Sequence, residues 1–88
     1  MDIIAKLLSL LLRGQYEFTQ HALEELDEDN LTYDDVLSCF ASGSLRRAWR
    51  GQRKYEVQGR AIDGRGMRVI ARLIGPRRLR IITAHVLR

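Results

Sequence analysis

The chain has 88 residues, of which 45% are hydrophobic and 30% charged, and this predicts one soluble domain spanning residues 1–88. The single cysteine, Cys39, excludes an internal disulfide framework and a cysteine-rich zinc site, and it favours a reducing, cytoplasmic location. The net charge of +4 conceals an asymmetry: residues 1–43 carry two basic and nine acidic residues (net −7), whereas residues 44–88 carry thirteen basic and two acidic residues (net +11).

The most apolar stretch, Ile3–Leu12, predicts a helix from about Asp2 to Arg13, because its apolar residues recur at helical spacing and Gly14 follows. It is too short for a membrane span, which needs about 20 residues, and it lacks the basic leader and cleavage site of a secretory signal. We therefore expect no membrane partner. Its leucines extend beyond one helical face, which favours packing on two sides and a homodimer through residues 2–13.

Two further helices are expected between residues 15 and 43. Thr19 is suited to cap the first of them, after a short extended segment at Tyr16–Phe18. Thr32 and Asp35 match the capping-box pattern, in which a threonine cap is followed three residues later by an acid. Apolar residues then recur at helical spacing up to Gly43, where a helix end is expected. Residues 1–14 and 15–43 are therefore predicted to form three helices.

From residue 44 the periodicity changes from helical to alternating, which predicts β-strands. Four strands are expected, at Leu45–Arg50, Lys54–Ile62, Met67–Ile74 and Leu79–Leu87. The short connections between sequential strands predict an antiparallel sheet over residues 44–88, with the helices packed on one face. The predicted fold is therefore α+β, in the order ααα-ββββ.

Strand alternation also predicts which side chains share a face of the sheet. On the third expected strand, Arg68 and Arg72 share a face with Ile70 and Ile74, opposite the face of Met67, Val69, Ala71 and Leu73. On the fourth, His85 is expected to share a face with Leu79, and Arg80 to point the other way. The pattern thus groups the first two arginines and separates His85 from Arg80.

The basic C-terminal half is a candidate surface for an anionic partner, such as RNA, the ribosome or an acidic protein. Twelve of its thirteen basic residues are arginines, whose planar guanidinium suits phosphates and carboxylates. Trp49 lies among them, placed either to stack on a base or to cover an edge of the core. The alternative interpretation is an ordinary solvated sheet face. The candidate anion-binding residues are Arg46, Arg47, Arg53, Lys54, Arg68 and Arg72.

Cleavage of RNA without a metal needs a base, an acid and cations near the phosphate. The candidate catalytic residues are His21, Tyr55 and His85, since histidine titrates near neutral pH and tyrosine can donate a proton. The alternative roles are structural: His21 would clamp the second helix to the sheet, and His85 would be half-buried and hydrogen-bonded. The sequence contains no metal-ligand spacing and no nucleotide-binding motif, so no metal and no cofactor are predicted.

Several short motifs occur in one order along residues 16–86. They are Phe18-Thr19-Gln20-His21-Ala22, the capped helix at Thr32–Val36, the Tyr55–Gly59 strand, the Asp63-Gly64-Arg65 hairpin and Ile81-Ile82-Thr83-Ala84-His85. Together they resemble the bacterial domain-of-unknown-function family numbered four-two-five-eight, which is distantly similar to the RelE, ParE and BrnT toxins of toxin–antitoxin pairs. The resemblance leaves the first helix as an addition.

This resemblance implies a RelE-like fold and a toxin-like protein that an acidic antitoxin-like partner silences. RelE-type toxins cut messenger RNA, so the first functional hypothesis is a metal-independent endoribonuclease acting on mRNA. The second is a non-catalytic basic module that binds nucleic acid or an acidic protein. The third is self-association, with the acidic helices of one copy against the arginine-rich sheet of another. Whether the chain is an enzyme stays open at the level of sequence.

Overall fold

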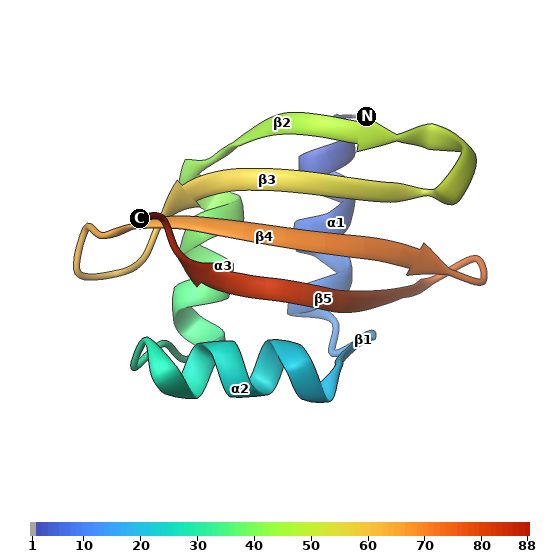
Figure 1. Ribbon diagram of the computed structural model, residues 1–88. Coiled ribbons are helices and arrows are strands. Elements are labelled where there is room, and N and C mark those ends of the chain that lie inside the picture. The colour runs from blue at the N-terminus through green and yellow to red at the C-terminus, as the bar shows by residue number, and fades with distance from the viewer. Residues whose placement is uncertain (1) are drawn as a thin grey trace.

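Three α-helices and a mixed five-stranded sheet make up the fold, which a computed structural model describes over residues 2–88 (Figure 1). The elements are α1 (Ile3–Leu12), β1 (Tyr16–Phe18), α2 (Gln20–Glu28), α3 (Tyr33–Ser42), β2 (Ser44–Trp49), the short 3-10 helix η1 (Arg50–Gln52), β3 (Lys54–Arg60), β4 (Gly66–Ile74) and β5 (Arg78–Val86). The predicted α+β class is confirmed. The four predicted strands correspond to β2–β5, with their ends shifted by one or two residues.

The prediction of about four antiparallel strands was incomplete, because the sheet has the order β1-β5-β4-β3-β2. β2 to β5 pair antiparallel in sequence, as expected, whereas β1 pairs in parallel with β5 at the far edge. The Leu79 N–H donates to the Gln15 carbonyl and the Thr19 N–H to the Ile81 carbonyl, each at 3.0 Å, so the pairing extends to both ends of β1. The extended segment expected at Tyr16–Phe18 is confirmed as β1, but its pairing was not predicted, because three residues are too few to indicate a partner strand.

Capping side chains start all three helices at the positions that the sequence predicts. Asp2 accepts from the Ile4 N–H at 3.2 Å, and the Thr19 hydroxyl accepts from the Ala22 N–H at 3.1 Å. At α3 the Thr32 N–H donates to the Asp35 carboxylate at 2.8 Å, and the Asp35 N–H donates back to the Thr32 hydroxyl at 3.3 Å. Each cap is worth about 1 kcal/mol of helix stability.

One face of the sheet is apolar and lies under α1 and α3 (Figure 1). Every second residue of β4 from Met67 to Leu73 is buried there, and Phe40 of α3 and Leu7 of α1 belong to the same cluster. Burial of each large apolar side chain stabilises the fold by about 1.5–3 kcal/mol. The core therefore fixes one face of the sheet and leaves the opposite face uncovered; that opposite face is called the open face below.

The apolar excess of α1 is partly used inside the chain. Leu10 is buried as well as Leu7 and Leu11, and the Tyr33 hydroxyl donates to the Leu11 carbonyl at 2.6 Å, tying α3 to the end of α1. Leu12 remains 66% exposed, and the homodimer through residues 2–13 stays a prediction. Over residues 2–88, no helix combines the length and the apolar composition that crossing a membrane would need.

α2 lies along the β5 edge of the sheet, so the expectation that every helix covers one face holds only for α1 and α3 (Figure 1). Beyond the end of β1, backbone N–H groups of β5 donate hydrogen bonds to two carboxylates, one in α2 and one at its C-cap. Glu25 accepts from Ala84 at 3.1 Å and Asp29 from Val86 at 2.8 Å. The acidic helix thus satisfies backbone donors that an additional strand would otherwise pair.

A β-bulge in β5 reverses the prediction for His85. Ile70 pairs with Thr83 and the next residue of β4 pairs with Ile81, so Ile82 is an extra residue on β5. An extra residue shifts the alternation by one position, and every side chain after it changes face. Leu79 and Ile81 point into the core before the bulge, and Ala84 does so after it. His85 therefore lies on the open face, with Arg80, and the predicted separation of the two was wrong.

Candidate nucleic-acid interface

The register of the sheet arranges the open-face side chains in rows that cross the strands. Directly opposite residues of antiparallel strands point to the same face, with neighbouring strands about 4.8 Å apart. The first row holds Trp49, Lys54, Arg72 and Arg80, the second holds Arg47, Glu56, Ile70 and Thr83, and the third holds Ser44, Gln58, Arg68 and His85. The predicted grouping of Arg68 and Arg72 on one face is confirmed.

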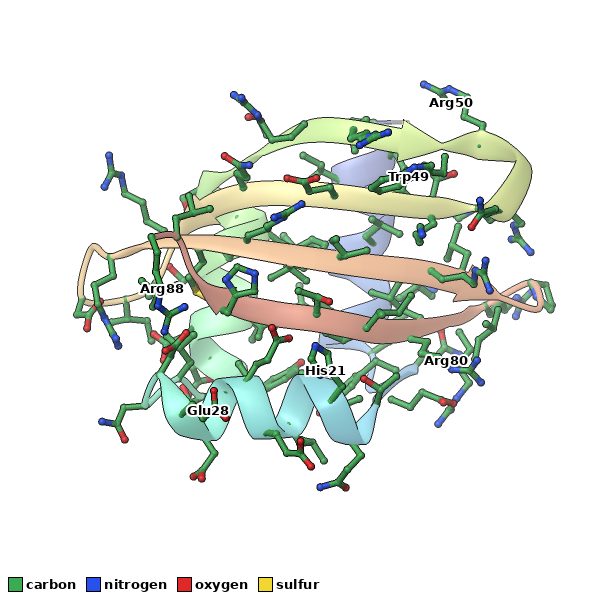
Figure 2. The ribbon with its side chains drawn as sticks, viewed as in Figure 1. His21, Glu28, Trp49, Arg50, Arg80 and Arg88 are labelled. Carbon is green, nitrogen blue, oxygen red and sulfur yellow. The ribbon has the colours of Figure 1, made fainter. Side chains whose placement is uncertain are left out.

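The first row combines an aromatic ring with a line of cations. The Lys54 Nζ lies 4.5 Å from the centroid of the Trp49 ring, and the guanidinium carbon of Arg47 lies 4.6 Å from it. Arg72 is held by Gln52, whose backbone carbonyl and side-chain oxygen both accept from it at 3.1 Å. Neither oxygen carries a formal charge, so Arg72 keeps its positive charge uncompensated. Trp49 therefore lies half-buried on the open face among cations (Figure 2).

Arg68 differs from the other open-face cations because a buried carboxylate binds it. Its Nε lies 3.2 Å from one oxygen of Glu56, and its Nη2 donates to the other at 3.3 Å. Gln58 donates to Glu56 as well, at 2.9 Å, and only 6% of Glu56 is exposed. A charge buried to this degree requires a partner, so Arg68 is committed to the sheet. Of the predicted anion-binding residues, Arg68 is thus the one that the structure neutralises.

The two histidines lie on neighbouring elements, His85 near the C-terminal end of β5 and His21 on α2, which lies along β5. His85 is the cross-strand neighbour of Arg68, and its Nδ1 lies 2.8 Å from the Val86 carbonyl oxygen. An Nδ1–H donated to that oxygen leaves the Nε2 lone pair free. His21 is exposed on α2 with its Nε2 3.4 Å from Glu25, the same carboxylate that accepts from β5 (Figure 2). His21 therefore lies at the edge of the segment that carries His85.

Tyr55 is not brought together with the histidines. Its neighbour Lys54 points to the open face, so Tyr55 points into the core, where it is 8% exposed. Cys39 is fully buried as well, and burial raises the pKa of its thiol to about 12, which keeps it protonated and unreactive. Neither side chain is placed to meet a ligand on the open face.

The remaining predicted cations gather around β2 and η1. Arg46 and Arg47 are exposed, as is their neighbour Arg50, which was not among the predicted residues, and within residues 2–88 none of the three forms an ion pair with a carboxylate. The same holds for Arg53, whose guanidinium donates to the Gly75 carbonyl at 3.0 Å. A cleft of about 310 Å³ opens at the other end of β2, lined by Ser42, Ser44, Arg46, Gln58, Gly59, Arg60, Gly66 and Leu87.

At the opposite edge the arginines are matched with acids. The Nε atoms of Arg78 and Arg80 lie 3.0 and 2.9 Å from the two oxygens of Glu17, and these two bonds, Arg78 first, hold the pKa of Glu17 below its usual value. Arg88 pairs with Asp29 in the same way. The acidic N-terminal half thus neutralises the edge of the sheet against which it packs.

Sequence reasoning missed two features of this surface. Arg80 was assigned no role, because only the bulge reveals that it shares a face with His85. Glu56 was also passed over, although it is the one acid in residues 44–62, a signal that could have marked it as a partner for an arginine. Within residues 2–88, no three histidine, cysteine, aspartate or glutamate side chains lie close enough together to hold a metal ion.

Comparisons with known proteins identify a family and no activity. A family model described as a domain of unknown function (DUF4258) matches residues 18–86, which run from the end of β1 to the end of β5. Neither the comparison with curated proteins nor the one with solved structures gave a match. α1 and most of β1 lie outside the matched residues.

Proposed function

The chain belongs to the DUF4258 family, and we propose that it binds single-stranded RNA on the open face of its sheet. One observation carries the proposal: the row of Trp49, Lys54 and Arg72, which sets an aromatic ring beside cations that no carboxylate neutralises. Proteins bind single strands by combining such cations for the phosphates with aromatic rings on which bases stack.

The geometry favours a single strand over a duplex. The cationic face is formed by strands, and among residues 2–88 the helices lie behind the sheet or along its β5 edge, so none of them is placed to enter a groove (Figure 1). An unpaired base is free to stack on the Trp49 ring, displacing one of the two cations that now lie 4.5 and 4.6 Å from its centroid. The strand would then run along β2 and β3, where Arg47 and Lys54 reach its phosphates.

Fluorescence anisotropy with a labelled oligouridylate tests this proposal. Affinity should fall steeply with salt, because phosphate binding releases counterions. Trp49→Ala should weaken binding about tenfold with little change in the salt slope, since stacking contributes about 1–3 kcal/mol per base. An affinity that is unaffected by Trp49→Ala would refute the assigned face. Binding to poly-glutamate but not to RNA would instead favour an acidic protein as the partner.

Cleavage of the bound RNA is a second candidate function, favoured by the position of His85 on the open face, which also carries Lys54 and Arg72. With its Nδ1 donating to Val86, the His85 Nε2 would accept the proton of a 2′-hydroxyl as that oxygen bonds to phosphorus and the bond to the 5′-oxygen breaks. His21, on the helix that lies along β5, is the candidate acid for the leaving oxygen. Cleavage of mRNA in this way would be a toxin-like action.

Growth on induction separates cleavage from binding alone. A ribonuclease should arrest growth and shorten messenger RNA, and His85→Gln should relieve the arrest while oligouridylate binding is retained. His85→Gln is preferred to alanine because its amide can keep a polar contact on the strand. Arrest that persists in His85→Gln, or induction of soluble protein without arrest, would leave the RNA-binding proposal standing and remove the catalytic one.

A further inference from the structure

A second cationic site lies on the side of the sheet that carries α1, away from the open face. A cleft of about 540 Å³ separates α1 from the β4–β5 turn and is lined by Lys6, Ser9, Leu10, Arg13, Pro76 and Arg77. Residues 1–43 contain only two basic residues, Lys6 and Arg13, and both line this cleft. The acidic half of the chain thus places all of its positive charge at one point.

Helical spacing explains how α1 presents these groups together. Positions 6, 9 and 13 are separated by three and four residues, so their side chains follow one face of the helix. The helix dipole stabilises a positive charge at the C-terminal end of α1, and this alone would explain the position of Arg13. It does not explain Lys6, which lies two turns earlier, or Arg77, which comes from the β4–β5 turn.

The electrostatic setting of the cleft is one-sided. It is lined by three cations and no carboxylate, and within residues 2–88 none of the three takes part in an ion pair. The adjacent residue, Arg78, shows the contrast, because it is paired with Glu17 at 3.0 Å. Three unpaired cations around a concave surface create a positive potential that favours a multiply charged anion.

The lining also has an apolar part. Leu10 is 6% exposed and forms part of the floor, and Pro76 contributes a rigid apolar wall from the turn. The volume lies within the range of about 300–1,000 Å³ typical of small-molecule sites. The combination of three cations, the Ser9 hydroxyl and an apolar floor suits a ligand that carries both a phosphate and an apolar ring.

We propose that this cleft binds a phosphorylated small molecule of nucleotide size, with its phosphate at Lys6, Arg13 and Arg77 and its ring over Leu10 and Pro76. The site is independent of RNA binding on the open face. It depends on α1, which lies outside the residues that match the family.

The test is a titration of the ¹⁵N-labelled full chain with adenosine 5′-monophosphate, followed by amide chemical shifts. Saturable shifts are expected at residues 6–13 and 75–78. Adenosine and inorganic phosphate should each bind at least tenfold more weakly than the nucleotide. The double variant Lys6→Gln, Arg77→Gln should weaken nucleotide binding by about tenfold or more, since two charge-assisted contacts are lost.

The matched control is the double variant Arg46→Gln, Arg50→Gln, which removes the same charge from the β2 edge. It should change nucleotide affinity by less than about twofold. All four arginine and lysine side chains concerned are exposed, so folding should be retained, and Arg77→Gln alone, with about a threefold loss, serves if the double variant unfolds.

Three outcomes would overturn the proposal. The first is a set of shifts confined to the open face or spread evenly over all arginine-bearing segments. The second is equal affinity for inorganic phosphate and for the nucleotide, which would show that Leu10 and Pro76 do not contribute to binding. The third is a loss of oligouridylate affinity in Lys6→Gln, Arg77→Gln as large as the loss of nucleotide affinity, which would make the cleft part of the RNA surface.

Discussion

The two edges of the sheet carry the same side chain in opposite electrostatic settings. At the β1–β5 edge, Arg78 and Arg80 share Glu17, and Arg88 is paired with Asp29. At the β2 edge, Arg46, Arg47 and Arg50 have no carboxylate partner within residues 2–88. The difference lies in what each edge contacts, because β5 is the strand with which β1 pairs and along which the acidic α2 lies (Figure 1).

This contrast shows how a chain with a modest net charge can present a strongly basic surface. The net charge of −7 on residues 1–43 and the net charge of +11 on residues 44–88 are not distributed evenly over the surface. The acids that contact the sheet lie along one edge, and exposed charges more than about 8–10 Å away are screened at physiological ionic strength. The β2 edge and the adjoining open face therefore keep the positive charge that the net value conceals.

The largest expected effect comes from removing the unpaired cations. The triple variant Arg47→Gln, Lys54→Gln, Arg72→Gln should weaken oligouridylate binding about a hundredfold at low salt and lower the salt slope by about 2. The matched triple variant Lys6→Gln, Arg13→Gln, Arg77→Gln has the same net charge and should bind RNA within about threefold of the parent. Equal losses in the two would mean that overall charge, rather than the open face, determines RNA binding.

The comparison also shows how far sequence reasoning reaches. Local signals predicted the caps at Asp2, Thr19 and Thr32, because a cap depends on residues two or three positions apart. Alternation placed Arg68 and Arg72 correctly for the same reason. The bulge at Ile82 could not be predicted from the sequence of β5 alone. A bulge is an extra residue relative to the partner strand, so it becomes visible only when the pairing with β4 is known. One extra residue was enough to misplace His85.

The candidate surface was less predictable than the fold. The basic character of residues 44–88 was visible, but its neutralisation depends on acids far away in the chain. Glu17 meets Arg78 across 61 residues, and Asp29 meets Val86 across 57. No spacing rule applies over such separations, so the sequence could not show which arginines remain unpaired.

The ion pairs and hydrogen bonds of the β1–β5 edge should contribute to the stability of the fold. Asp29→Ala should lower the free energy of unfolding by about 2 kcal/mol, because it leaves the part-buried N–H of Val86 without an acceptor and Arg88 without a partner. Urea denaturation measures the change. Arg47→Ala on the other edge should cost about 0.5–1 kcal/mol, since that side chain is exposed and loses only its contact with the Trp49 ring. A similar cost at both positions would remove the distinction between the edges.

Acid should destabilise the fold through the same edge. The Val86 N–H and then Arg88 hold the pKa of Asp29 below its ordinary value of 3.8, although burial raises it. A carboxyl with a lowered pKa stabilises the fold above about pH 4, and the contribution is lost as the pH falls through the folded-state pKa, because the unfolded chain then binds more protons.

Asp35 should add to this loss. Burial raises the pKa of Asp35, but its hydrogen bonds from Ile62 and Thr32 outweigh burial and lower it below 3.8. Urea midpoints measured from about pH 6 down to about pH 2 should therefore decline most below pH 4, and the decline should be shallower in Asp29→Asn. An identical pH profile in that variant would show that the Asp29 carboxylate does not stabilise the β5 edge.

The smallest expected effect is the most direct test of the contrast between the edges. Glu17→Gln removes the acid that Arg78 and Arg80 share, so the β1–β5 edge gains the unpaired cations that the β2 edge already has. Arg80 lies in the same row as Lys54 and Arg72, which extends the cationic row by one position across the open face. Oligouridylate affinity should rise about threefold at low salt and should show no gain at high salt.

The matched control, Asp63→Asn, frees Arg65 in the β3–β4 hairpin, away from the row, and should leave RNA affinity unchanged. If Glu17→Gln fails to raise the affinity, then an unpaired arginine on this sheet is insufficient for RNA binding, and the aromatic ring of Trp49 must be what distinguishes the β2 edge.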